Sequence, residues 1–262
     1  MNNLTIIILI FTACILECCT SPFSQNHQKK VYNGIDAELY KDTPAWQLVR
    51  ALDNGRFELA KEKIRKDSSL ANFVEPVYGN SVLFWAALNS NEKAVELLLN
   101  NGARVNMCNF FGESPLEMAA FYNPCESNIL QMMLKHQPKN DSMSLYLRNE
   151  ALVSASSNCL NFVKLLVSNK ANPSWISKKD KTFNALTPLS ESVVQKKFDI
   201  VEYYLIDLGV DPSIGSITTI DGDTISITEL LQKSYKVERT FGQEETRQRI
   251  SKILDFLEKK KK

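Results

Sequence analysis

The chain is organised around GNSVLFWAA at 79–87 and AVELLLNNGARVN at 94–106. The first run predicts a turn followed by a helix that ends in two alanines, and the second predicts another helix that ends near Gly102. A short helix with an Ala-Ala face has too little apolar surface to be stable alone. It needs a near-copy of itself on each side, so the fold depends on whether the chain contains such copies.

Three further copies follow in the sequence. GESPLEMAA at 112–120 repeats the opening 33 residues later, and LQMML at 130–134 repeats VELLL at 95–99 after 35 residues. The other two copies are EALVSA at 150–155 with VKLLV at 163–167, and LTPL at 186–189 with IVEYYL at 200–205. Repetition at this spacing predicts a solenoid in which each unit contacts only its neighbours.

A period of 33 with a turn, Pro-Leu, Ala-Ala and a second apolar helix resembles the ankyrin repeat. The Thr-Pro-Leu-His opening of that family survives in part as SPLE at 114–117 and TPLS at 187–190. No copy has the His that ties neighbouring turns in the family, so we expect a less regular stack. The resemblance implies an all-α ankyrin-repeat solenoid of stacked helix-turn-helix units, about six repeats with degenerate terminal caps. Its function then depends on surface residues rather than on the fold.

Weaker helix pairs are expected at both ends of the stack. Thr43 predicts an N-cap with Pro44 at the first helical position, and apolar spacing from Trp46 to Ile64 predicts a degenerate first repeat. Apolar spacing from Ile227 to Leu257 predicts the closing helices. DGDT at 221–224 resembles the opening of another repeat; its alternative, a calcium loop, would need alternating carboxylates that the apolar residues after Asp223 do not supply.

The N-terminal residues are expected to lie outside the repeats. Leu4 to Leu16 is uncharged and apolar apart from two threonines, which fits a signal-peptide core but is too short to span a bilayer as a helix. Leu16 stands three residues before Cys19, which resembles the lipobox of bacterial lipoproteins, in which the cysteine is lipidated. Cys14 is the alternative lipidation site, and a plain secreted or anchored segment is a third interpretation.

This organisation predicts a lipoprotein-like signal peptide at 1–18, a flexible tether at 19–42 and an ankyrin-repeat domain at 43–262. The tether is polar and carries few apolar residues, so it cannot form a packed core. The predicted location is the bacterial cell envelope, where a lipid anchor would hold the protein on a membrane facing the periplasm or the cell surface.

Composition and motifs offer no basis for catalysis. The formal net charge is +1 and the sequence pI is about 7.5, which argues against nucleic acid as a partner. His27 and His136 are the two histidines, and neither has a cysteine or carboxylate at metal-ligand spacing. No phosphate-binding loop, nucleophile elbow or dinucleotide fingerprint occurs. We expect a non-enzymatic, monomeric protein without cofactor or metal, whose partner is another protein.

Three cysteines lie beyond the N-terminal segment: Cys108, Cys125 and Cys159. Cys125 and Cys159 fall at nearly equivalent points of successive repeats. Stacked helices lie about 8–10 Å apart, whereas a disulfide needs Cα atoms within about 7 Å. All three cysteines are therefore expected to remain thiols, partly buried in the stack.

Aromatic residues mark the candidate partner site. Turn tips, where the family projects its β-turn fingers, carry Tyr78, Phe110 and Phe111, although Phe110 or Phe111 could instead fold back to pad a repeat. Phe121 and Tyr122 end a first helix, on the side that the family uses as its concave face. The remaining candidates, expected to form a polar rim, are Asn109 and Glu113.

These residues predict a protein-binding module of the envelope that uses the concave face and the turn tips. One specific form is an immunity or inhibitor protein that occupies a toxin or an enzyme. The alternative is a structural lipoprotein that organises several envelope proteins. Trp85 and Met118, beside the alanines, are expected in the core instead.

Overall fold

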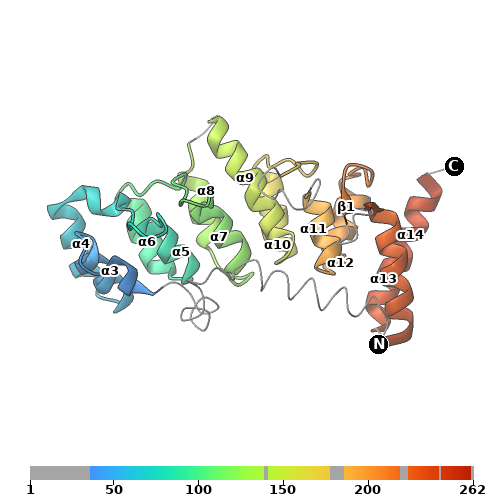
Figure 1. Cartoon of the computed structure of the whole chain (residues 1–262), viewed down its shortest axis with the longest axis horizontal. Helices are drawn as coiled ribbons and strands as arrows, with labels where there is room; N and C mark the ends of the chain where they lie inside the picture. Colours follow the sequence, from blue (N-terminus) through green and yellow to red (C-terminus); the bar gives the residue numbers. More distant parts are fainter. Residues whose placement is uncertain (1–35, 139–140, 178–185, 219–223, 242, 261–262) are drawn as a thin grey trace.

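The computed structural model describes residues 36–138, 141–177, 186–218, 224–241 and 243–260. In these ranges the helices form six successive pairs that stand side by side in one elongated row, from α3 at one end to α14 at the other (Figure 1). Both helices of a pair are short, and each pair packs on the next, so the core is a continuous strip through the row. The predicted all-α solenoid of about six repeats is confirmed.

The first helices of the pairs form one layer and the second helices form the other. The first helices are α3 (Trp46–Asp53), α5 (Val82–Leu88), α7 (Pro115–Tyr122), α9 (Ser142–Ala155), α11 (Pro188–Val194) and α13 (Ile227–Phe241). The second helices are α4 (Phe57–Lys66), α6 (Glu92–Asn100), α8 (Ile129–His136), α10 (Leu160–Ser168), α12 (Phe198–Glu202) with the π-helix η3 (Tyr203–Asp207), and α14 (Glu244–Lys260).

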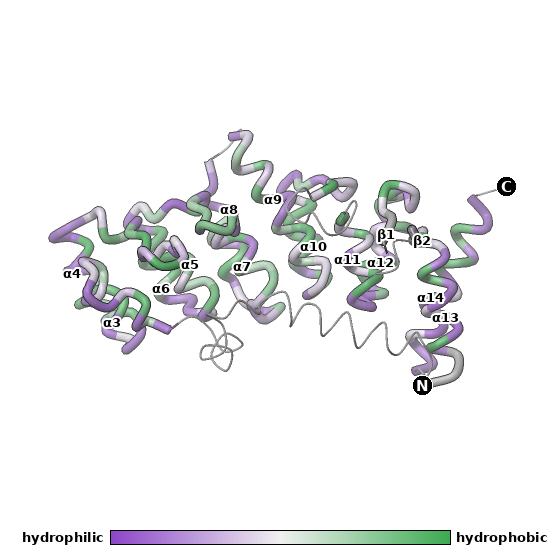
Figure 2. The backbone as a smooth tube through the Cα atoms, in the orientation of Figure 1, coloured by the Kyte–Doolittle hydropathy of each residue, from purple (hydrophilic) through white to green (hydrophobic). Residues whose placement is uncertain are grey.

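Small residues allow the first helices to approach closely. Ala86 in α5 and Ala119 in α7 are fully buried, and α5 packs against α7. Trp85 is also buried, as predicted, but Met118 is only half-buried, so its predicted place in the core is wrong. Green and purple alternate along α14 in Figure 2, as expected of a helix that buries one side against the row.

The Ser-Pro and Thr-Pro openings work as helix caps. Ser114 accepts the N–H of Glu117, whose carboxylate accepts the N–H of Ser114 at 3.1 Å. Thr187 and Ser190 form the corresponding box on α11, and a proline occupies the first turn of both helices. Each box satisfies backbone N–H groups that a helix start leaves without partners, which explains why these openings begin helices.

Asparagine side chains connect the turns of neighbouring repeats. Asn123 Nδ2 donates to the carbonyl of Ala87 at 2.8 Å, and Asn158 Nδ2 donates to the carbonyl of Ala120 at 3.0 Å. Both bonds run from one repeat to the repeat before it. These asparagine amides connect neighbouring repeats at the C-terminal ends of the first helices. The family's His, which this chain lacks, would connect them at the N-terminal ends.

The folded part begins before the predicted boundary at residue 43. The short 3₁₀ helix η1 (Ala37–Tyr40) packs on α3, and Tyr40 is fully buried. The Tyr40 hydroxyl lies 2.9 Å from the carbonyl oxygens of both Asn80 and Ser81. Thr43 is not the predicted N-cap, because its hydroxyl donates to the carbonyl of Tyr40 and α3 begins at residue 46.

The other irregular elements lie between repeats. The 3₁₀ helix η2 (Ser68–Asn72) leads from α4 towards α5, and a short antiparallel hairpin of β1 (Ser216–Thr218) and β2 (Thr224–Ser226) precedes α13. Residues 221–223 of the DGDT motif lie outside the described ranges. None of the helices within the described ranges is long and apolar enough to cross a membrane.

The last pair closes the row with charged residues outside and apolar residues inside. Ile250, Ile253 and Leu257 of α14 are buried. Glu202 at the end of α12 accepts hydrogen bonds from two residues of α14, Arg249 at 2.7 Å and Lys252. A terminal repeat with a polar outer face is what a solenoid requires for solubility.

Candidate partner-binding surface

The turn tip before α5 is built around one buried carboxylate. Glu75 is fully buried and accepts backbone N–H groups from Val77 at 2.6 Å, Tyr78 at 3.0 Å and Asn80 at 2.9 Å. Three backbone N–H groups that donate to one side chain hold this tip together. Its apolar side chains point outward as a result: Val77 is exposed and Tyr78 is half-buried.

The next tip, before α7, is built around Asn109. Its Oδ1 accepts the N–H groups of Phe111 and Glu113 at 3.0 Å each, and its Nδ2 donates to Glu113 at 2.8 Å and to Asn80 at 3.2 Å. Asn109 is buried and Glu113 is half-buried. Asn109 thus forms the inside of the tip and does not contribute to the predicted polar rim, whereas a rim role for Glu113 stays a prediction.

Phe110 and Phe111 extend from this tip with 69% and 68% of their surface exposed. One edge of the Phe110 ring covers Gly79, where a Cβ atom would lie only 2.6 Å from the ring, and the Phe110 N–H donates to the carbonyl of Tyr78. The Phe111 ring centre lies 6.3 Å from that of Tyr78. Phe110 therefore pads the preceding repeat and still offers most of its surface to a partner.

In the following repeat, the positions that correspond to Phe110 and Phe111 lie in a helix instead of a turn. Asn123 and Asn158 bond to equivalent carbonyls of their preceding repeats, and they stand 35 residues apart. The same offset from 110 and 111 leads to Leu145 and Tyr146, in the extended first half of α9. Leu145 is exposed and Tyr146 is half-buried. Sequence reasoning missed both, although the two-residue insertion in the preceding copy, which sets this offset, was visible.

Tyr146 is held among polar and aromatic neighbours. Its ring centre lies 5.9 Å from that of Trp175, edge to face. Trp175 Nε1 donates to the buried Glu150 at 2.9 Å, and the Ser177 hydroxyl donates to the same carboxylate at 2.7 Å. Burial, and next the charge of Glu150, raise the pKa of Tyr146 to about 12, so its hydroxyl is neutral at physiological pH.

We call the resulting surface the tip strip. It crosses three consecutive repeats and consists of Val77, Tyr78, Phe110, Phe111, Leu145 and Tyr146. The tips that carry it are fixed by internal hydrogen bonds, so these side chains are presented without a large loss of freedom on binding.

Phe121 and Tyr122 lie elsewhere. They occupy the last turn of α7, 44% and 46% exposed, with ring centres 4.7 Å apart. The tip strip adjoins the first turn of the same helix, and six or seven residues of helix separate the two by about 10 Å. The predicted aromatic site is therefore two surfaces, the tip strip and this helix-end pair.

Near the same C-terminal end of α7, a disulfide contradicts the predicted thiols. Cys125 and Cys159 are bridged, with Cα atoms 6.0 Å apart. The stacking distance was the wrong measure, because Cys125 lies in the connection after α7 and Cys159 caps the start of α10. Connections between helices can approach more closely than helix axes. The predicted thiol state is confirmed for Cys108.

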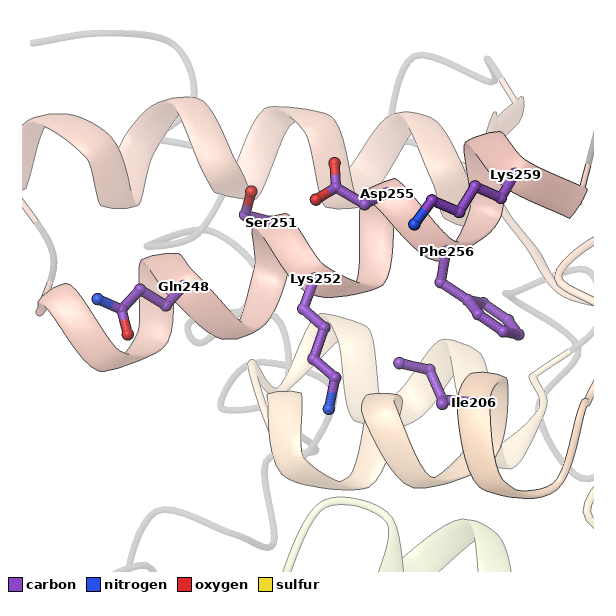
Figure 3. A pocket seen from close by; sticks show the side chains of 7 residues that line it. All are labelled: Ile206, Gln248, Ser251, Lys252, Asp255, Phe256 and Lys259. Carbon is purple, nitrogen blue, oxygen red and sulfur yellow. The ribbon is translucent and has the colours of Figure 1, made fainter.

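Metal sites and pockets are two further kinds of candidate site in the described part of the chain. No group of three potential metal ligands occurs there. An open groove of about 480 Å³ separates η3 from α14, with Ile206 and Phe256 on its apolar side (Figure 3). Lys252, at its edge, is already paired with Glu202. The predicted lipidation sites Cys19 and Cys14 lie outside the described residues.

Comparison with known proteins agrees with this architecture. The family described as ankyrin repeats (3 copies) matches residues 48–144. A crystal structure of EF0377, described as an ankyrin repeat protein, superposes with a TM-score of 0.57 at 24% identity, over 80% of this chain and 96% of that one. Ankyrin repeats indicate a protein–protein interaction module and are typically non-catalytic. The chain thus contains ankyrin repeats over residues 48–144, and its fold is an all-α ankyrin-repeat solenoid.

Proposed function

We propose that this protein binds a partner protein of the bacterial cell envelope through the tip strip, and that it acts as an inhibitor or immunity protein. The observation that carries the proposal is that corresponding positions of three consecutive repeats hold exposed apolar side chains: Val77, Phe110 with Phe111, and Leu145. Single exposed apolar residues are ordinary, whereas several gathered on neighbouring tips are typical of an interaction surface.

The chemistry of the strip favours a partner with an apolar segment of its own. Aromatic side chains bury a large area with few rotatable bonds, and they are the residues most often found as interface anchors. Phe110 and Phe111 are also the most exposed large apolar residues in the described ranges. A partner that covers them gains most of its binding free energy at the centre of the strip.

Alanine at both central positions tests this proposal. The Phe110→Ala, Phe111→Ala variant should bind the partner well over tenfold more weakly, because each anchor contributes about 2 kcal/mol or more. Capture from membranes with the wild-type chain supplies the partner, and titration calorimetry measures the affinity. The helical circular dichroism signal should stay unchanged, since both rings are mostly exposed.

Two controls separate the tip strip from other surfaces. Leu59→Ala removes an exposed apolar side chain from α4, a second helix, and should leave the affinity unchanged. The Phe121→Ala, Tyr122→Ala variant removes the helix-end pair. If that variant loses binding while the Phe110→Ala, Phe111→Ala variant binds normally, the partner site lies at the far end of α7 and not on the tip strip. One stoichiometric nanomolar partner favours inhibition, and several weak partners favour a scaffold.

The envelope location is supported by two independent features. The uncharged Leu4–Leu16 segment contains Cys14 and is followed by Cys19, and the Cys125–Cys159 disulfide is of a kind that persists in oxidising compartments. Intact-mass spectrometry of protein extracted from membranes should show a missing leader and added lipid at Cys19 or Cys14. Two or more acyl chains would hold the protein firmly on the membrane. An intact, unmodified N-terminus would reject the anchor.

A further inference from the structure

The third and fourth repeats are joined differently from the others. On the second-helix side, α6 packs against both α4 and α8, and α12 packs against α14, whereas α8 with α10, like α10 with α12, makes little contact. On the first-helix side, α7 and α9 pack closely. In a solenoid each repeat is held only by its neighbours, so this boundary depends on the first helices and on whatever else links the two repeats.

The disulfide adds a covalent link at this boundary, next to the hydrogen bonds that Asn158 donates to the carbonyls of Ala120 and Asn123. The connection between α7 and α8 runs from 123 to 128, six residues, whereas the connection between α5 and α6 runs from 89 to 91, three residues. The added length lets Cys125 reach Cys159, which begins α10. Both cysteines are half-buried, so a small reductant in solution can reach them.

The same connection is fixed on its other side by the preceding repeat. Glu92 at the start of α6 accepts the Ser127 hydroxyl at 3.0 Å and the Asn128 N–H at 2.8 Å. Repeats two and three are therefore connected here through hydrogen bonds, and repeats three and four through a covalent bond. The disulfide is the covalent link between repeats in the described ranges.

The tip strip crosses this boundary. Phe110 and Phe111 belong to the third repeat, and Leu145 and Tyr146 belong to the fourth. We propose that the Cys125–Cys159 disulfide holds the two parts of the tip strip in register, so that partner binding requires the oxidised protein. This inference rests on the proposed function and adds a redox dependence to it.

The reaction that releases the two repeats is thiol–disulfide exchange with a dithiol. A thiolate of the dithiol attacks one sulfur of the bridge, which gives a mixed disulfide and one cysteine thiolate that takes up a proton. The second thiol of the dithiol then displaces the other cysteine. The dithiol is oxidised to its own disulfide, and Cys125 and Cys159 gain two electrons and two protons between them.

Hydrogen exchange measured by mass spectrometry tests the structural half of the proposal without any partner. Wild-type protein is compared before and after treatment with dithiothreitol, next to a Cys125→Ser, Cys159→Ser variant. Amides in α7 and α9 should exchange at least about tenfold faster once the bridge is absent, and amides in α4 and α6 should not change. Cys108→Ser, which keeps the bridge, should behave as oxidised wild type. Equal exchange in all four samples would overturn the proposal.

Affinity measurements test the second half of the proposal, the dependence of partner binding on the disulfide. The probe is the protein that the wild-type chain captures from membranes, and its affinity is measured for every variant. Its affinity should fall at least about tenfold for both the reduced protein and the double serine variant, and stay unchanged for Cys108→Ser. Binding that responds to the phenylalanine changes but not to reduction overturns only the redox dependence. Binding that ignores the phenylalanine changes overturns the proposed function, and the redox dependence with it.

Discussion

Replacing Cys125 and Cys159 together by serine should lower the free energy of unfolding by about 3–4 kcal/mol. The bridge joins positions 34 apart in the sequence. A cross-link restricts the unfolded chain, and loops of about 15 and 100 residues give about 3 and 4.7 kcal/mol, so this loop falls between them, at about 3.8 kcal/mol. Chemical denaturation under non-reducing conditions, followed by circular dichroism, measures the change.

The matched control is Cys108→Ser, which removes a half-buried thiol and leaves the bridge intact. Its effect should be within about 1 kcal/mol, because a half-buried side chain of this size loses little packing. Dithiothreitol should lower the stability of wild type and of this control, but not that of the double serine variant. Equal stability of oxidised wild type and the double variant would mean that the folded protein does not contain the bridge.

Stability should also fall steeply above pH 10, because two buried tyrosines must ionise when the chain unfolds into alkaline solution. Tyr40 and Tyr204 are both fully buried. Burial raises the pKa of both phenols above the usual value, and the charge of Glu75 adds to the effect at Tyr40. The Ser156 hydroxyl, 2.8 Å from the Tyr204 hydroxyl, opposes the shift only in part.

The direction of the pH dependence follows from these raised values. Below the unfolded pKa of about 10, both states hold the phenolic proton and the full stability is present. Between that value and the folded pKa, only the unfolded state loses the proton, so each tyrosine lowers the free energy of unfolding by about 1.4 kcal/mol per pH unit. Because the two phenols act independently, the loss of stability with pH should be steepest while both remain protonated in the folded state.

Urea denaturation at several pH values between 8 and about 12 checks the slope. Tyr40→Phe and Tyr204→Phe should each reduce the slope above pH 10, whatever stability they lose at neutral pH. Tyr122→Phe is the control, because Tyr122 is nearly half exposed whereas Tyr40 and Tyr204 are fully buried. Slopes that are the same in all three variants would show that neither buried phenol stays neutral in the folded state.

Local chemistry was enough to predict the repeats. Ser114 and Thr187 mark helix starts because a hydroxyl followed by proline can cap the first turn in any context. The Ala pairs mark the buried faces because only small residues let the first helices approach. Trp85 was placed correctly for the same reason, since its neighbours in the sequence already defined the inner face.

The candidate site was only half visible in the sequence. Phe110 and Phe111 stand out beside a turn signal, and the structure shows them at an exposed tip. Leu145 and Tyr146 lie in a helix where the other copies have a turn, so no local pattern marks them as continuing the strip. Asn109 was assigned to the surface because asparagine is polar, but its amide satisfies the backbone of its own tip.

The sequence by itself determined the number of repeats, the starts of the two helices that Ser114 and Thr187 cap, and the buried faces, because these depend on residues within one or two turns of each other. Only the tertiary structure decided which surfaces of different repeats meet. The Cys125–Cys159 bridge depends on how far a six-residue connection reaches beyond its own repeat, and the tip strip depends on the register between three repeats. Both are distances between segments remote in the chain, which packing sets and periodicity alone does not contain.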